Sequence, residues 1–129
     1  MADINLKAYK ASEISFVNKH ENGTKITFGN KFTYNVRYSN GNVCVGEITA
    51  EVFDKENPEK FGIKIVIEGI FEYNTEIKKE QIHVLSFKEL YPFAKSIVAS
   101  TSVNAGVPPI MLPNFDIEGQ SIYKFEKNI

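Results

Sequence analysis

The sequence predicts an α+β fold in which a four-stranded antiparallel sheet is followed by one long amphipathic helix. Apolar and polar residues alternate over most of the first 73 positions, which is typical of strands. Apolar residues then recur at helical spacing from Leu90 onward. A chain of 129 residues with 43% hydrophobic and 24% charged residues has the length and composition of one folded domain, so we expect a single domain over residues 1–129.

The first half of the predicted sheet consists of two strands joined by a long crossover. Residues 6–17 alternate loosely, and one face of this strand carries Leu6, Ala8, Ile14 and Phe16. In the polar crossover, residues 20–30, Ile26 and Phe28 are apolar anchors. Strict alternation then predicts a second strand whose apolar face carries Phe32, Tyr34, Val36 and Tyr38.

Two further strands complete the predicted sheet. Asn40-Gly41 favours a tight hairpin turn, because both central residues of a type I′ turn need positive φ. The third strand, residues 43–53, should direct a small apolar set inward: Cys44, Ile48, Ala50 and Val52. A charged turn with Pro58 precedes the fourth strand, whose inward residues should be Phe61, Ile63, Ile65, Ile67 and Phe71.

The helix has start and stop signals of its own. Ser86 and Glu89 have capping-box spacing, which would place Pro92 in the first turns and His83 before the helix. Gly106 and the following Pro108-Pro109 should end it. One stripe consists of small residues that would let a second helix or subunit approach closely: Ser96, Ala99, Ser100 and Val103.

The residues that carry chemistry are few and scattered. His20 and His83 lack metal-ligand spacing, so we expect neither a metal nor another cofactor. Cys44 lies on an apolar strand face, where a buried, inert thiol is the favoured interpretation. The loop before Leu90 contains no glycine to cradle a phosphate. We therefore expect a protein that is not an enzyme; a small enzyme with a pocket under the helix is the third-ranked hypothesis.

Net charge and hydropathy bear on partners and location. A net charge of −1 provides no field to attract nucleic acid or an anionic membrane. No stretch approaches the apolar length of a membrane span, and the N-terminus lacks the apolar core of a signal peptide. We therefore expect a cytoplasmic protein that binds no nucleic acid and does not insert into a membrane.

The aromatic content is unusual: 10 Phe and 6 Tyr but no Trp. The first interpretation of this content is an ordinary aromatic core. However, one helix does not easily cover four long strands, so some apolar surface should remain for oligomerisation or for a binding partner.

Two motifs resemble the SecB protein-export chaperone family. They are Leu90-Tyr91-Pro92-Phe93-Ala94-Lys95 and the run from Gly106 through Pro113 to Asn114-Phe115-Asp116. Gly69-Ile70-Phe71 and Ile14-Ser15-Phe16 extend the similarity toward the N-terminus. The resemblance implies a SecB-like fold that assembles as a homodimer or homotetramer, without cofactor or catalysis.

The resemblance also implies a function. SecB chaperones hold unfolded or nascent polypeptides, including preproteins for translocation, in hydrophobic grooves without ATP and pass them to the SecA motor. This leads to our first hypothesis, an ATP-independent holdase whose expected role is protein transport through the Sec pathway. The alternative is a SecB-like adaptor dedicated to one client, such as the antitoxin of a toxin–antitoxin system.

Candidate residues follow from the same resemblance, position by position. The implied client-binding residues are Ile26, Phe28, Phe32, Tyr34, Val36, Phe61, Ile63, Ile65, Ile110, Met111 and Leu112. Glu13 and Ser15 are the implied partner-binding residues on the exposed sheet face. Two features depart from the family: Lys64 replaces an acidic residue expected for SecA docking, and Gly119 interrupts the region of the C-terminal helix, which predicts a shortened C-terminal region.

Overall fold

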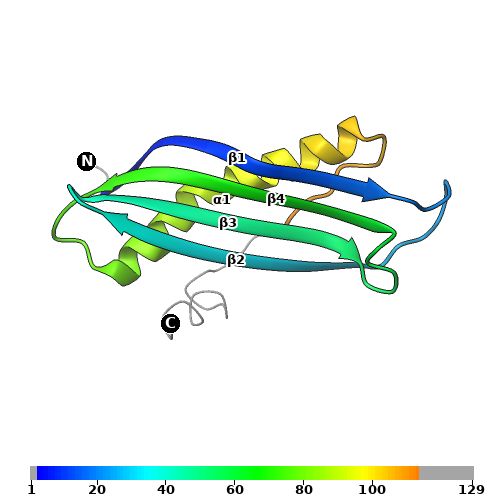
Figure 1. Ribbon diagram of the computed structural model, residues 1–129, viewed down its shortest axis with the longest axis horizontal. Coiled ribbons are helices and arrows are strands. Elements are labelled where there is room, and N and C mark those ends of the chain that lie inside the picture. Colours follow the sequence, from blue (N-terminus) through cyan, green and yellow to red (C-terminus); the bar gives the residue numbers. More distant parts are fainter. Residues whose placement is uncertain (1–2, 114–129) are drawn as a thin grey trace.

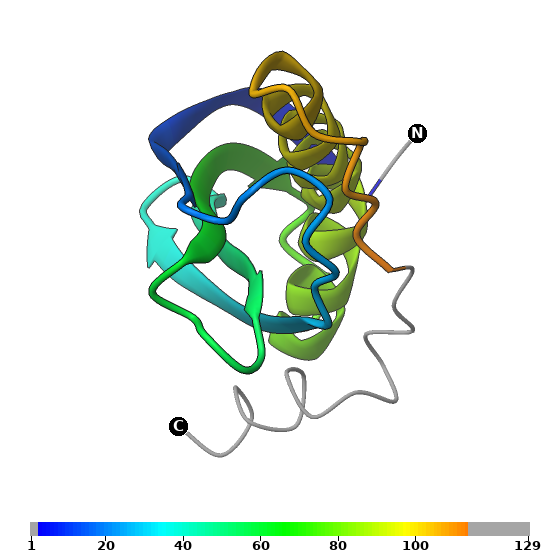
Figure 2. The same ribbon diagram turned by 90° about the vertical axis from the view of Figure 1, so that its right-hand side faces the viewer.

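The computed structural model describes residues 3–113 as one sheet and one helix. Its elements in chain order are β1 (Ile4–Asn18), β2 (Phe28–Ser39), β3 (Val43–Asp54), β4 (Phe61–Tyr73) and α1 (Lys79–Asn104). The strands are arranged in the order β1-β4-β3-β2, and every neighbouring pair is antiparallel. Helix α1 lies across one face of the sheet (Figures 1 and 2). The predicted α+β fold class is thus confirmed.

The face of the sheet toward α1 forms the core. All nine predicted inward residues of β3 and β4 are buried, from Cys44 to Phe71. Alternation places the apolar residues of both central strands on this one face, and α1 covers it with residues at spacings of three and four. The buried set on α1 includes Phe87, Leu90, Ala94 and Val98.

The predicted apolar face of β1 is wrong at Ala8. Register shifts occur between Leu6 and Ala8 and between Ala11 and Glu13. Each shift inserts an extra residue, so the inward side changes parity along the strand. Ala8 pairs with Ile70 on the outer face, while Tyr9 pairs with Gly69 on the inner face and stacks on Phe93 at 4.3 Å between ring centroids. Simple alternation cannot reveal such bulges.

The predicted start of the helix is also wrong. Helix α1 begins at Lys79, where the backbone N–H of Lys78 donates to the Gln81 side chain. Ser86 is therefore not a cap but a buried residue inside the helix, and its hydroxyl shares a 2.5 Å hydrogen bond with the Tyr34 hydroxyl. His83 belongs to the helix, and Pro92 lies in its interior.

The end of α1 agrees with its stop signals. Gly106 adopts a φ of +89°, a conformation that glycine reaches without a steric penalty. Residues 107–113, the return segment, then run back along the helix. The Ser102 hydroxyl accepts the Ile110 N–H at 2.9 Å, and the Tyr91 hydroxyl donates to the Pro113 carbonyl. The predicted shortened C-terminal region lies beyond residue 113, outside the described residues.

Candidate functional site

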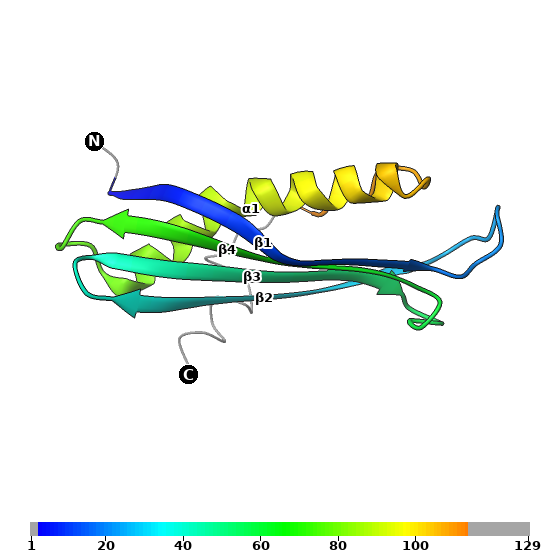
Figure 3. The ribbon, with the colours of Figure 1, turned by 45° about the horizontal axis from the view of Figure 1, so that its top comes forward.

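One functional candidate is a hollow of about 680 Å³ between the β1–β2 crossover and the return segment. We call it the crossover hollow. The crossover passes beside the β3–β4 turn at one end of the sheet (Figure 3). The hollow lies at this end, and its walls come mainly from the crossover and the return segment. Asn18, residues 20–24, Ile26 and Phe28 form the crossover wall, and residues 106–111 form the opposite wall.

Aromatic and aliphatic side chains form the floor of the crossover hollow. Phe28 is 45% exposed, and its ring centroid lies 5.5 Å from that of buried Phe61. Phe16 also packs edge-on against Phe61, at 5.5 Å between ring centroids. Ile110 is buried against this cluster. The floor is therefore held rigidly by the core while Phe28 stays accessible from outside.

A second hollow, of about 490 Å³, lies on α1 and includes Phe87, Tyr91, Pro92 and Ala99. We call it the helix hollow. Met111 belongs to the walls of both hollows and is 70% exposed. Alternation along the return segment explains its position, because Ile110 and Leu112 turn toward the core and leave Met111 outside. An accessible methionine thus stands where the two hollows meet.

The structure divides the predicted client-binding residues into two groups. Ile26, Phe28 and Met111 line the crossover hollow with accessible surface, and Phe61 and Ile110 form its floor. Tyr34, Ile63, Ile65 and Leu112 are buried in the core, while Phe32 and Val36 are half-buried on β2. Helix α1 covers the inner face of the sheet, so the predicted residues on this face belong to the core and not to an accessible surface.

Sequence reasoning missed a polar pair beside the crossover hollow. The imidazole Nε2–H of His20 donates to a carboxylate oxygen of Asp54 at 2.7 Å, and both side chains are largely buried. Burial alone would raise the pKa of Asp54, but hydrogen bonds from the Glu56 N–H, His20 and the Asn57 N–H lower it overall. The two residues are 34 positions apart, and no local motif links them.

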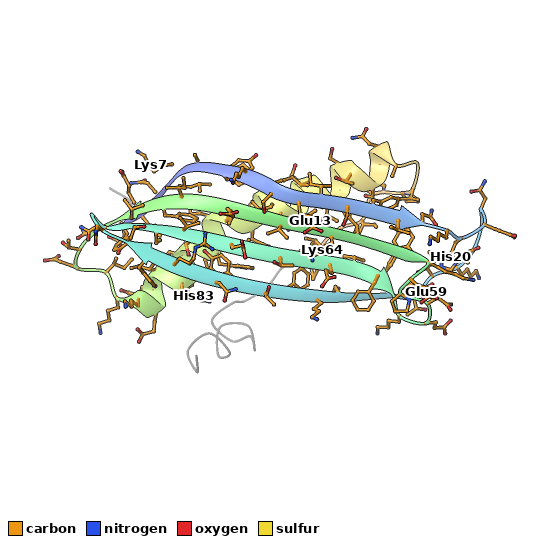
Figure 4. All side chains as sticks on the ribbon, in the orientation of Figure 1. Lys7, Glu13, His20, Glu59, Lys64 and His83 are labelled. Atoms are coloured by element: carbon orange, nitrogen blue, oxygen red, sulfur yellow. The ribbon has the colours of Figure 1, made fainter. Side chains whose placement is uncertain are left out.

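The outer face of the sheet carries ion pairs between neighbouring strands. Lys64 Nζ lies 3.9 Å from a carboxylate oxygen of Glu13, and the two are close together near the middle of the sheet in Figure 4. Ser15 pairs in register with Lys64 on the same face. The predicted partner-binding residues therefore lie on the face away from α1, with the charge of Glu13 offset by Lys64.

The buried titratable groups have the properties of core residues. Burial raises the pKa of the Cys44 thiol to about 11 and lowers the pKa of His83. Cys44 is fully buried, so its thiol stays protonated and shielded at neutral pH, in line with the expected inert cysteine. Within residues 3–113, no three His, Cys, Asp or Glu side chains gather closely enough to bind a metal ion.

The comparisons with known proteins point to one group of chaperones. A SecB-like chaperone of Mycobacterium tuberculosis, solved in complex with a peptide from the HigA1 antitoxin, superimposes with a TM-score of 0.70. The match covers 88% of this chain and 91% of that one, at 12% sequence identity. A protein of unknown function from Streptococcus agalactiae matches with a TM-score of 0.45 at 16% identity, over 86% of this chain and 97% of that one.

A sequence comparison agrees with the fold. The protein-export protein SecB of Rhodospirillum centenum is 37% identical over 60 residues, which are 43% of this chain. The matched region spans about a third, 36%, of that relative. No family model matches the chain.

The fold is that of a SecB-like chaperone, and the resemblance to the SecB family is confirmed by the fold together with the 60-residue match. Of these two relatives, one is named as a protein-export protein and the other as a chaperone. The helix among residues 3–113 is not apolar enough over a sufficient length to cross a membrane.

Proposed function

We propose that this protein is a SecB-like chaperone that holds unfolded polypeptide segments in the crossover hollow without using ATP. The observation that carries this proposal is the exposed pair Phe28 and Met111 above an aromatic floor. An unfolded chain offers apolar side chains with no fixed geometry. A hollow lined by a flexible methionine and aromatic rings can bury many such side chains, each contributing about 25 cal/mol per Å² of apolar area.

Suppression of aggregation tests this proposal directly. A chemically denatured model protein is diluted into buffer with stoichiometric amounts of this chain and no ATP, and light scattering is followed. The wild type should suppress aggregation, while Phe28→Ser and Met111→Ser should suppress it less. Ile70→Ser is the matched control, because Ile70 is as exposed as Phe28 but lies on the outer sheet face. Equal suppression by all variants would exclude the crossover hollow as the binding site.

A second candidate function is a dedicated adaptor for one client, as opposed to general export through the Sec pathway. The ion pair between Lys64 and Glu13 favours the adaptor, because Lys64 offsets the negative charge of Glu13 on the face that the resemblance assigns to SecA docking. The related chaperone that was solved with an antitoxin peptide adds support. Binding of purified SecA before and after Lys64→Glu, together with a panel of unrelated unfolded clients, distinguishes the two functions.

We also propose that the chain works as a homo-oligomer in the cytoplasm, where nascent chains are exposed. Strand β1 is an edge strand with accessible apolar side chains, among them Tyr9 and Ile14. The small-residue stripe on α1 is accessible too, with Val103 52% exposed. Both surfaces could form isologous contacts in a dimer or tetramer.

A further inference from the structure

The hydrogen bond between His20 and Asp54 joins two loops that are distant in sequence. His20 begins the crossover, and Asp54 is the last residue of β3. A carboxylate oxygen of Asp54 also accepts the backbone N–H groups of Glu56 and Asn57, at 2.9 and 3.3 Å. Asp54 is therefore fixed by the turn it caps, and the His20 side chain is attached to a rigid support.

Two backbone hydrogen bonds fasten the crossover to the same turn. The Lys19 N–H donates to the Lys60 carbonyl at 2.7 Å, and the Lys55 N–H donates to the Thr27 carbonyl at 2.9 Å. Between these two points, residues 21–26 are exposed apart from half-buried Ile26. Among the side chains of residues 19–27, His20 alone forms an ion pair with another element in the described part of the chain.

We propose that the His20–Asp54 pair is a latch that positions the crossover as a wall of the crossover hollow and thereby sets how tightly the hollow binds an unfolded chain. This inference rests on the proposed function. His20 lines the hollow, while Asp54 does not. Asp54 therefore acts from behind the binding surface and holds His20 in place within it, which reduces the ordering that the crossover must undergo when a client binds.

Substitutions at the two positions separate the latch from general stability. His20→Ala removes the contact but leaves Asp54 with its two backbone donors. His20→Gln places an amide N–H in reach of the same carboxylate and should restore the latch. Asp54→Asn retains an oxygen for the Glu56 and Asn57 N–H groups but removes the charge. Lys25→Ala is the matched control, since Lys25 is exposed in the same crossover and lies outside the lining of the hollow.

The experiment measures the Kd of a permanently unfolded probe, a reduced and carboxymethylated protein, by fluorescence anisotropy for each variant. His20→Ala and Asp54→Asn should each raise the Kd of the probe about fivefold. The Kd of the double variant should be no higher than the higher Kd of the two single variants. Lys25→Ala should bind like the wild type, and His20→Gln should recover most of the affinity that His20→Ala loses. Hydrogen exchange of the Lys19 and Lys55 amides should accelerate in His20→Ala, with the β3–β4 pairing unchanged.

The outcomes keep the two proposals apart. If the wild type does not bind the probe, the proposed function fails. If the wild type binds while His20→Ala and Asp54→Asn bind equally well, the latch is overturned and the proposed function stands. Independent, additive losses in the double variant would also overturn the latch, because two residues acting through one contact must be coupled.

Discussion

At the scale of single residues, one missing side chain makes room for a buried polar contact in the core. A Cβ at Gly46 would lie 2.2 Å from the Tyr34 hydroxyl oxygen. Glycine at this position lets Tyr34 reach across the sheet face to Ser86 on α1 and pack edge-on against Phe87. The contact between β2 and the helix therefore depends on a residue of the neighbouring strand β3.

Gly46→Ala should destabilise the protein by about 1–3 kcal/mol, because Tyr34 must move and the Tyr34–Ser86 hydrogen bond is lost. The comparison is Gly62→Ala in β4, where a Cβ would meet its nearest atom at 3.7 Å, an ordinary contact. That change should leave the free energy of unfolding nearly unchanged or raise it slightly. Urea unfolding of both variants is the measurement, and equal effects would contradict this account.

Asp54 gives the stability of the protein a predictable dependence on pH. Its hydrogen bonds lower its folded-state pKa, so its contribution is present above the unfolded carboxyl pKa of about 3.9 and is lost as pH falls through the lowered folded value. The stability difference between wild type and Asp54→Asn should therefore shrink as the pH falls below about 4. Urea unfolding at a series of pH values measures it; a difference independent of pH would refute the assignment.

At the scale of elements, the return segment is attached to α1 by a buried serine. The Ser102 hydroxyl donates to the carbonyls of Val98 and Ala99 and accepts the N–H of Ile110. This bond holds the return segment in the position that turns Ile110 inward and leaves Met111 accessible. Together with the Tyr91 hydroxyl, which donates to the Pro113 carbonyl, Ser102 holds the wall that the two hollows share.

Ser102→Ala should cost about 1–3 kcal/mol, since the buried Ile110 N–H loses its acceptor. It should also accelerate hydrogen exchange at Ile110. Ser96→Ala, on the exposed face of the same helix, should change stability by a few tenths of a kcal/mol at most. Thermal unfolding and hydrogen exchange compare the two variants, and a Ser102→Ala protein as stable as wild type would show that the return segment has other sufficient contacts.

At the scale of the whole molecule, apolar surface remains at the places that a single covering helix cannot reach. Strand β1 is an edge of the sheet, and Ile14 remains half exposed there although it belongs to the inner face. The crossover hollow lies at one end of the same sheet. Assembly and client binding can therefore use different surfaces of one small domain.

Ile14→Asp should convert the proposed oligomer to monomers or weaken its association at least about tenfold, because a buried carboxylate at an edge-strand interface would lack a partner. Ile70→Asp is the control: Ile70 is 45% exposed, close to the 50% of Ile14, but lies on the outer face of β4. Sedimentation equilibrium gives the mass of each variant. A wild-type monomer, or dissociation caused by Ile70→Asp alone, would contradict an interface along β1.

The parts of the fold that sequence predicts best are those whose pattern is local. Alternation in β3 and β4 placed every inward residue correctly, and Gly106 with its prolines marked the end of α1. The first turns of α1 were missed because Ser86 and Glu89 have the spacing of a cap although Ser86 is buried in the helix against Tyr34. Five of the predicted client-binding residues line the crossover hollow: Ile26, Phe28, Phe61, Ile110 and Met111. The contact between His20 and Asp54 was not predicted.

The sequence by itself determined the α+β order of strands and helix, the apolar faces and the resemblance to SecB chaperones, because periodicity and short motifs are properties of neighbouring residues. Only the tertiary structure decided which apolar residues remain accessible. Packing against α1 buries Tyr34, Ile63 and Ile65, whereas the crossover and the return segment meet beyond the cover of the helix and leave a hollow. The latch between His20 and Asp54 also exists only in three dimensions, since chain folding brings two residues that are 34 positions apart to within 2.7 Å of each other.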